Sequence, residues 1–140
     1  MSAKQELFKK IWSFKDDPLG YVDYAFAWDQ IPPLYGLEDW QREFLSSIRE
    51  PGKYGVCSGH GIGKGAIVSM VIMWFASTRY NPSIVVTANT AEQLSAKTWR
   101  ELSIWHRRAI NNFWFDWTAT RLSLKSNPAA HFAHAIPWSV

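Results

Sequence analysis

The residues with the clearest chemical pattern are the closely spaced glycines of residues 58–65, which read Ser-Gly-His-Gly-Ile-Gly-Lys-Gly. Gly59, Gly61 and Gly63 let the backbone curl so that several N–H groups point inward, with no side chains to obstruct an approaching anion. Lys64 adds a full positive charge beside them. The apolar segment after Lys64 predicts a buried helix whose positive dipole end faces the same place. The pattern therefore predicts a site for phosphate groups.

Two positions depart from the usual phosphate-loop pattern, which begins with Gly and has Ser or Thr after the Lys. Ser58 replaces the first Gly, and Gly65 supplies no hydroxyl for Mg²⁺, so we expect ATP to bind with weakened Mg²⁺ coordination. An alternative interpretation is a glycine turn between a strand and a helix, with an exposed Lys. We interpret His60 as a loop residue tolerated between glycines rather than as a catalytic base. The candidate phosphate-binding residues are Ser58, Gly59, His60, Gly61, Ile62, Gly63, Lys64 and Gly65.

Composition indicates one folded domain. The 140 residues are 47% hydrophobic and include nine Trp, eight Phe and five Tyr, which disordered chains lack. The net charge of +3 is compatible with a polyanionic partner, but the basic residues form no stripe. The single cysteine, Cys57, excludes an intrachain disulfide, and its apolar surroundings predict burial. Without a signal peptide or an apolar run of about 20 residues, we expect a soluble, intracellular protein that does not enter membranes.

Apolar periodicity and breaker residues predict alternating helices and strands. Helices are expected at residues 4–14, after the Asp17-Pro18 start signal, and at 38–49, 64–78 and 90–110, the last opened by a capping box at Thr90. Strands are expected at residues 54–57, 84–87 and 117–124, with irregular chain from Ser126. This order predicts an α/β fold with a parallel sheet, flanking helices and right-handed crossovers.

Other short motifs accompany the glycine-rich stretch. They are Asp17-Pro18-Leu19-Gly20-Tyr21-Val22, Trp40-Gln41-Arg42-Glu43, Val86-Thr87-Ala88-Asn89-Thr90 with Gln93, and Lys97-Thr98-Trp99. With these motifs the chain resembles, from about Asp17 to Trp138, the large subunit of a tailed-bacteriophage terminase, the ATPase that pumps viral DNA into the capsid. The breaker Gln30-Ile31-Pro32-Pro33 predicts a boundary between an N-terminal helical segment at residues 1–33 and a core at residues 34–140. The resemblance implies that this core is a partial P-loop ATPase, truncated before the acidic Mg-binding strand and the nuclease domain.

The resemblance also implies roles and partners. Lys64 and the glycine amides would hold the phosphates of ATP, Gln41 would bond the adenine edge, and residues 88–90, supported by Gln93, would couple the nucleotide site to DNA. Implied partners are double-stranded DNA, the portal and the small terminase subunit, in the cytoplasm of a bacterial host. Two alternatives stay open: Gln41 as a solvated helix residue, and Asn89-Thr90 as a helix cap alone.

The sequence lacks some of the expected machinery. No apolar run is followed by Asp-Glu, and the loop contains no arginine. Elsewhere, Arg79, Arg100, Arg107 and Arg108 are interpreted as solvated surface residues. We therefore expect weak or no ATP hydrolysis.

Two other functions stay open. One is a non-enzymatic remnant or interaction module that self-associates through an exposed sheet edge, and the other is a fragment of a helicase-type P-loop ATPase. His131 and His134 have no Cys or further His nearby, so we do not interpret them as a metal site.

Overall fold

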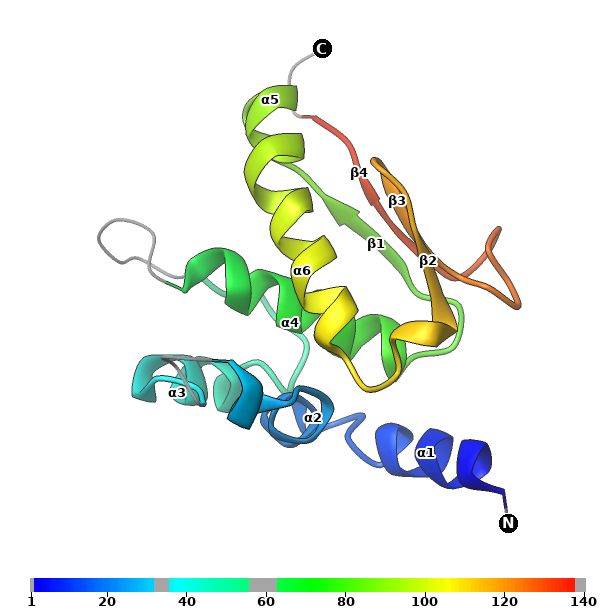
Figure 1. Cartoon of the computed structure of the whole chain (residues 1–140). Helices are drawn as coiled ribbons and strands as arrows, with labels where there is room; N and C mark the ends of the chain where they lie inside the picture. The colour runs from blue at the N-terminus through cyan, green and yellow to red at the C-terminus, as the bar shows by residue number, and fades with distance from the viewer. Residues whose placement is uncertain (1, 32–35, 56–62, 138–140) are drawn as a thin grey trace.

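The computed structural model describes residues 2–31, 36–55 and 63–137. In it, helices cover one face of a small mixed sheet (Figure 1). The expected strand at residues 54–57 is not formed at Tyr54 and Gly55, and Val56 and Cys57 lie outside the described residues. Within the described chain, no helix is both long and apolar enough to cross a bilayer. The α/β class is confirmed.

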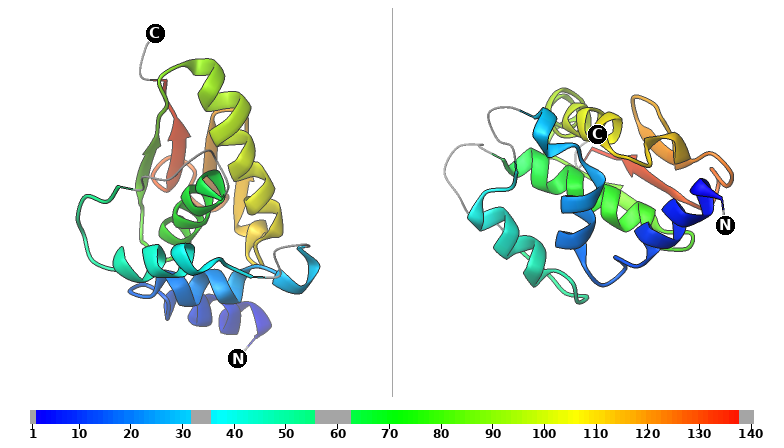
Figure 2. Two further views of the ribbon diagram at one scale, coloured as in Figure 1. Left: turned by 90° about the vertical axis from the view of Figure 1, so that its left-hand side faces the viewer. Right: turned by 60° about the horizontal axis from the view of Figure 1, so that its bottom comes forward.

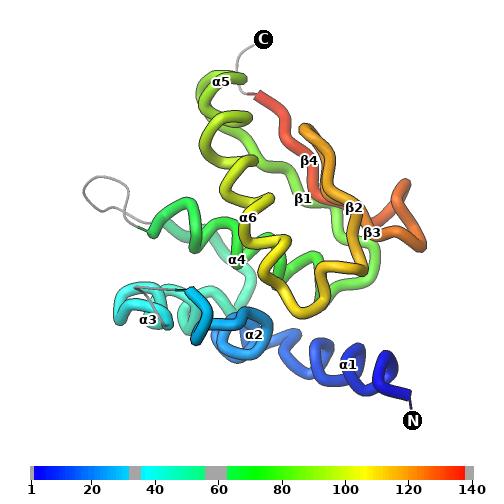
Figure 3. Tube along the Cα trace, viewed as in Figure 1, coloured from blue at the N-terminus to red at the C-terminus, as the bar shows by residue number. Residues whose placement is uncertain are grey.

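The N-terminal helices form where their start signals predict. α1 (Ala3–Trp12) begins at a Ser2 capping box, and α2 (Pro18–Ala25) begins where the Asp17 carboxylate accepts from the Gly20 N–H at 3.0 Å. A short 3₁₀ turn, η1 (Trp28–Gln30), and α3 (Asp39–Ser47) follow. Figure 3 shows α1, α2 and α3 in one layer.

α4 (Lys64–Ser77) lies between this layer and the rest of the molecule (Figure 2). It packs against α2 on one side and against α6 (Arg100–Arg108) on the other. The sequence predicts burial on more than one side, and this is confirmed: Ile67, Met70 and Met73 are at most 2% exposed, while Val68 is 42% exposed. The predicted division between residues 1–33 and 34–140 stays a prediction, but both parts contribute to one buried cluster.

The sheet of the described residues has the order β1-β4-β3-β2, with β1 at Ser83–Val86, β2 at Phe115–Trp117, β3 at Arg121–Leu124 and β4 at Phe132–Ala135. β1 and β4 run parallel, whereas β2, β3 and β4 are antiparallel neighbours. The prediction of a parallel sheet is therefore wrong. The reason is the tight turn at residues 118–120, which can join antiparallel strands but is too short for a parallel crossover.

Three strand predictions are corrected. Residues 117–124 are not one strand, because Thr118 Oγ1 accepts from the Arg121 N–H at 3.1 Å and closes a turn there. The chain after Ser126 is not irregular throughout: it forms β4, in which Ala133 is fully buried. β1, expected inside the sheet at residues 84–87, is an edge strand of the described sheet.

One continuous helical segment connects β1 to the hairpin. It consists of α5 (Ala91–Gln93), a π-helical stretch η2 (Leu94–Trp99) and α6, and Thr90 caps it by accepting from the Gln93 N–H at 3.1 Å. The cap is confirmed, and the helix ends slightly before the predicted Ile110, whose N–H donates to Ala25 O at 2.8 Å. Another 3₁₀ turn, η3 (Asn112–Trp114), leads into β2.

A closed ring of side-chain hydrogen bonds joins α2, α4 and the end of the α6 region. Tyr21 Oη donates to Asn111 Oδ1 at 3.1 Å, Asn111 Nδ2 donates to Ser77 Oγ at 2.9 Å, and Ser77 Oγ lies 3.3 Å from Tyr21 Oη. Burial raises the pKa of Tyr21 far above its usual range, so this hydroxyl keeps its proton. Since each of the three groups has its partners, the ring stabilises the packing of the layers.

Candidate phosphate-binding site

The start of α4 is built on a left-handed glycine. Gly63, the N-cap residue, has φ of 85° and ψ of 0°, a conformation that is strained for residues with a Cβ. Its carbonyl accepts from the Ile67 N–H at 3.0 Å and so begins the helix at Lys64. Gly63 has no side chain to cap the first turn, so the N–H groups of that turn are left to other acceptors.

Gln41 of α3 lies directly against this helix start. It is 6% exposed, its Nε2 donates to Gly63 O at 3.3 Å, and its Oε1 accepts from the Glu38 N–H at 2.9 Å. The alternative interpretation of Gln41 as a solvated helix residue is therefore wrong. Its amide joins the first turn of α3 to the end of the glycine-rich stretch.

A cavity of about 600 Å³ opens beside the first turn of α4 and faces η2 and α6. The charged residues that line it are Lys64, Lys97, Arg100 and Glu101. Positive side chains therefore outnumber negative ones around a helix N-terminus, and both features favour an anion. Burial of the described lining is partial, with Lys97 and Arg100 exposed, so solvent screens part of this attraction.

Glu101 occupies the space beside Gly65. A Cβ placed on Gly65 would lie 3.2 Å from Glu101 Cγ, and Glu101 Oε1 accepts from Trp105 Nε1 at 3.1 Å. In usual phosphate loops the residue at this position is Ser or Thr. Here the space beside Gly65 that such a side chain would enter is filled by the Cγ methylene group of Glu101. A larger residue at position 65 fits when this flexible side chain moves by a few tenths of an ångström.

The structure brings together Gln41, Gly63, Lys64 and Gly65 from the predicted site. The remaining predicted residues, Ser58, Gly59, His60, Gly61 and Ile62, lie outside the described residues. Asn89 and Gln93 are exposed and are not among the residues that line the cavity.

None of Lys97, Arg100 and Glu101 is a site residue predicted from the sequence: Lys97 is predicted only as part of a motif, Arg100 is interpreted as a surface residue, and no role is predicted for Glu101. Arg100 is exposed, as predicted for a surface residue, but it also lines the cavity. The signal was available, since residues 97, 100, 101 and 104 have the spacing of one helical face, and all of them line the cavity. The spacing alone could not show that this helical face lies opposite the start of α4.

The other arginines have different surroundings. The guanidinium of Arg79 lies 4.8 Å from the ring centroids of Trp74 and Phe75 at the far end of α4, and Arg108 lies 4.6 Å from the ring centroid of Trp105. His131 precedes β4, and His134 lies on it. Among the described residues, no group of three or more His, Cys, Asp and Glu gathers as metal ligands would.

A scan against protein-family models and searches of curated proteins and of solved structures found no match.

We predict that Gly63→Ala lowers the free energy of unfolding by about 1–3 kcal/mol, because a non-glycine residue is strained in the left-handed conformation. An added Cβ would also lie 2.6 Å from Gln41 Nε2. Gly36→Ala is the matched control, since nothing lies within 4 Å of its added Cβ. Urea unfolding followed by circular dichroism measures both. Equal stability of the two variants would contradict the described helix start.

Proposed function

We propose that the chain binds the phosphate groups of ATP at the start of α4, as the nucleotide-binding part of a phage terminase large subunit. The observation that carries this proposal is the helix start at Gly63 and Lys64, which opens onto a cavity lined by additional cations. The glycine-rich motif and the resemblance to the packaging ATPases support it. DNA, the portal and the small terminase subunit are the proposed partners, in the cytoplasm of a bacterial host.

The charge distribution supports a polyphosphate rather than a single phosphate. Lys64 comes from α4, whereas Lys97 and Arg100 come from the opposite wall. A triphosphate carries several negative charges along its length, so it can meet cations from both walls at once. The cavity of about 600 Å³ lies within the usual range of small-ligand sites.

The described residues fit Mg²⁺ less well than they fit phosphate. Mg²⁺ prefers several oxygen ligands, and Glu101 is the only carboxylate among the described residues that line the cavity. One of its oxygens already accepts from Trp105, and Gly65 brings no hydroxyl. We therefore propose that the chain binds ATP with weak dependence on Mg²⁺ and hydrolyses it slowly or not at all.

A second candidate function is a non-enzymatic interaction module. Val85 is 58% exposed on β1, and the described residues provide no strand on the other side of this edge. An apolar edge strand is a template for pairing with another chain. Self-association through β1 is therefore the form that this alternative takes.

Lys64→Ala should weaken ATP binding about tenfold to a hundredfold, since charge-assisted hydrogen bonds contribute about 1.5–3 kcal/mol. Arg100→Ala should weaken it by a smaller factor, about threefold to tenfold, because this side chain is exposed. Arg107→Ala, on the same helix but outside the cavity lining, is the control. Isothermal titration calorimetry with ATP measures all three, and an unchanged affinity of Lys64→Ala would refute the proposed site.

Gly65→Ser should tighten binding of Mg-ATP but leave binding of metal-free ATP unchanged, because the new hydroxyl is an additional Mg²⁺ ligand. Gly65→Ala is the matched control, as it makes the same steric demand on Glu101 without the hydroxyl. Calorimetry with Mg²⁺ and with EDTA separates the two effects. The same affinity for Mg-ATP in both variants would show that position 65 does not face the metal.

The wild-type chain should self-associate at micromolar concentration if the interaction-module alternative holds, and Val85→Lys should shift it toward monomer by placing charge on the β1 edge. Ile110→Lys, at a position 45% exposed and outside the sheet, is the control. Size-exclusion chromatography with light scattering gives the masses. A wild-type chain that elutes as a monomer would rule out this alternative.

A further inference from the structure

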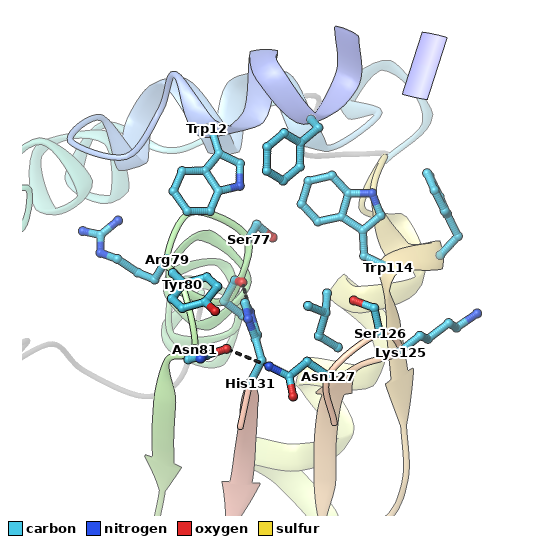
Figure 4. A pocket seen from close by; sticks show the side chains of 14 residues that line it. Trp12, Ser77, Arg79, Tyr80, Asn81, Trp114, Lys125, Ser126, Asn127 and His131 are labelled. Atoms are coloured by element: carbon cyan, nitrogen blue, oxygen red, sulfur yellow. Dashed lines mark hydrogen bonds between the residues drawn. The ribbon is translucent and has the colours of Figure 1, made fainter. Parts of the chain in front are cut away.

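A separate cavity of about 500 Å³ lies at the C-terminal end of α4 (Figure 4). α4 has 14 residues, so at about 1.5 Å per residue this cavity is about 20 Å from the start of the helix. It is enclosed by α1, by the residues between α4 and β1, by η3 and by the connection between β3 and β4. None of the residues that line it belongs to the candidate phosphate site.

Aromatic rings form the walls of this cavity, which we call the aromatic cavity. The ring centroid of Phe8 lies 5.5 Å from that of Trp12 and 5.8 Å from that of Trp114. Phe8 is 51% exposed, Phe113 is 47% exposed and Tyr80 is 83% exposed, although all three rings line the cavity. Gathered aromatic faces that remain accessible to solvent are typical of a ligand site, because flat rings stack on them.

His131 supplies a hydrogen-bond acceptor in this apolar setting. It is 6% exposed, and its Nε2 lies 2.6 Å from Ala76 O. A carbonyl oxygen accepts and never donates, so Nε2 carries the proton. Burial lowers the pKa of His131, which keeps the ring neutral near pH 7. The Nδ1 of a neutral ring protonated at Nε2 is an acceptor, and no group of the described residues donates to it.

Some of the other polar groups near the cavity are already paired, whereas Tyr80 and Ser126 are exposed and their hydroxyls have no partner among the described residues. Ser77 Oγ belongs to the closed ring with Tyr21 and Asn111, and Asn127 Nδ2 donates to Asn81 Oδ1 at 2.9 Å (Figure 4). His131 combines two features: it is only 6% exposed, and its Nδ1 accepts from no donor among the described residues. No fully buried side-chain nitrogen or oxygen of the described residues lacks a partner, so Nδ1 keeps contact with solvent. A ligand with an N–H or O–H group would replace water at this acceptor, which contributes about 0.5–1.5 kcal/mol.

We propose that the aromatic cavity binds a small, flat aromatic molecule that carries one N–H or O–H donor, of the class represented by indole. The ring would stack among Phe8, Trp12 and Trp114, and the donor would bond Nδ1 of His131. This site is separate from the proposed nucleotide site, since the two share none of the residues that the structure describes.

The test is binding of indole to the full chain, measured by calorimetry and by the ¹⁵N resonance of His131 Nδ1 in histidine-labelled protein. Indole should bind and shift this resonance upfield. 1-Methylindole has the same flat ring without the donor, so it should bind roughly twofold to tenfold more weakly and leave the resonance unshifted. Phe8→Ala should weaken indole binding about threefold to tenfold, and Ile110→Ala, outside the cavity, should not change it.

Several results would overturn the proposal. These are no binding of indole at millimolar concentration, equal binding of indole and 1-methylindole, and an unchanged affinity of Phe8→Ala. Binding of N-acetyltryptophanamide without binding of indole would also overturn it, because the cavity would then accept a side chain of a protein rather than a free molecule. The comparison of the two indoles uses the unaltered chain, so it holds even if Phe8→Ala fails to fold.

Discussion

The burial of α4 is the constraint on which the rest of the structure depends. A helix that is apolar on nearly every side cannot face solvent, so the chain must cover it from several directions. α2 covers one side and α6 another, and β4 of the sheet also contacts it. This explains why the N-terminal helices contribute to the common buried cluster. It also fixes the position of Lys64, because the helix that begins there has little freedom to move.

The two ends of α4 have different surroundings. At the C-terminal end, side chains satisfy the backbone: Thr78 Oγ1 donates to Trp74 O at 2.7 Å, and His131 Nε2 donates to Ala76 O. At the N-terminal end, the cap residue is a glycine, and the surrounding side chains that carry charge are mostly cations. The carbonyl groups at the C-terminal end of α4 are thus bonded within the protein, whereas the N-terminal end faces cations. This difference supports the proposed binding of an anion at the N-terminal end.

Much of the helical structure is predictable from the sequence, because its signals are local. Asp17-Pro18 and Thr90 begin helices where predicted, since a cap needs only residues a few positions away. The sheet is less predictable, because strand direction depends on which distant segments pair. β4 contains two alanines and a histidine, which have little preference for strands, and it becomes a strand only because β1 and β3 lie on both sides of it. The cation-lined cavity was missed for the same reason, as its walls are far apart in sequence.

The hydrogen bonds of Gln41 bear on how the proposed nucleotide would be recognised. Bonding an adenine edge in two places needs both a donor and an acceptor from the amide. The Oε1 of Gln41 already accepts from the Glu38 N–H, and one Nε2 hydrogen goes to Gly63 O. One Nε2 hydrogen and the second lone pair of Oε1 are left for a base. Charge-assisted bonds to phosphates are stronger than neutral bonds to a base, so at the proposed site the phosphates would contribute more of the affinity than the base.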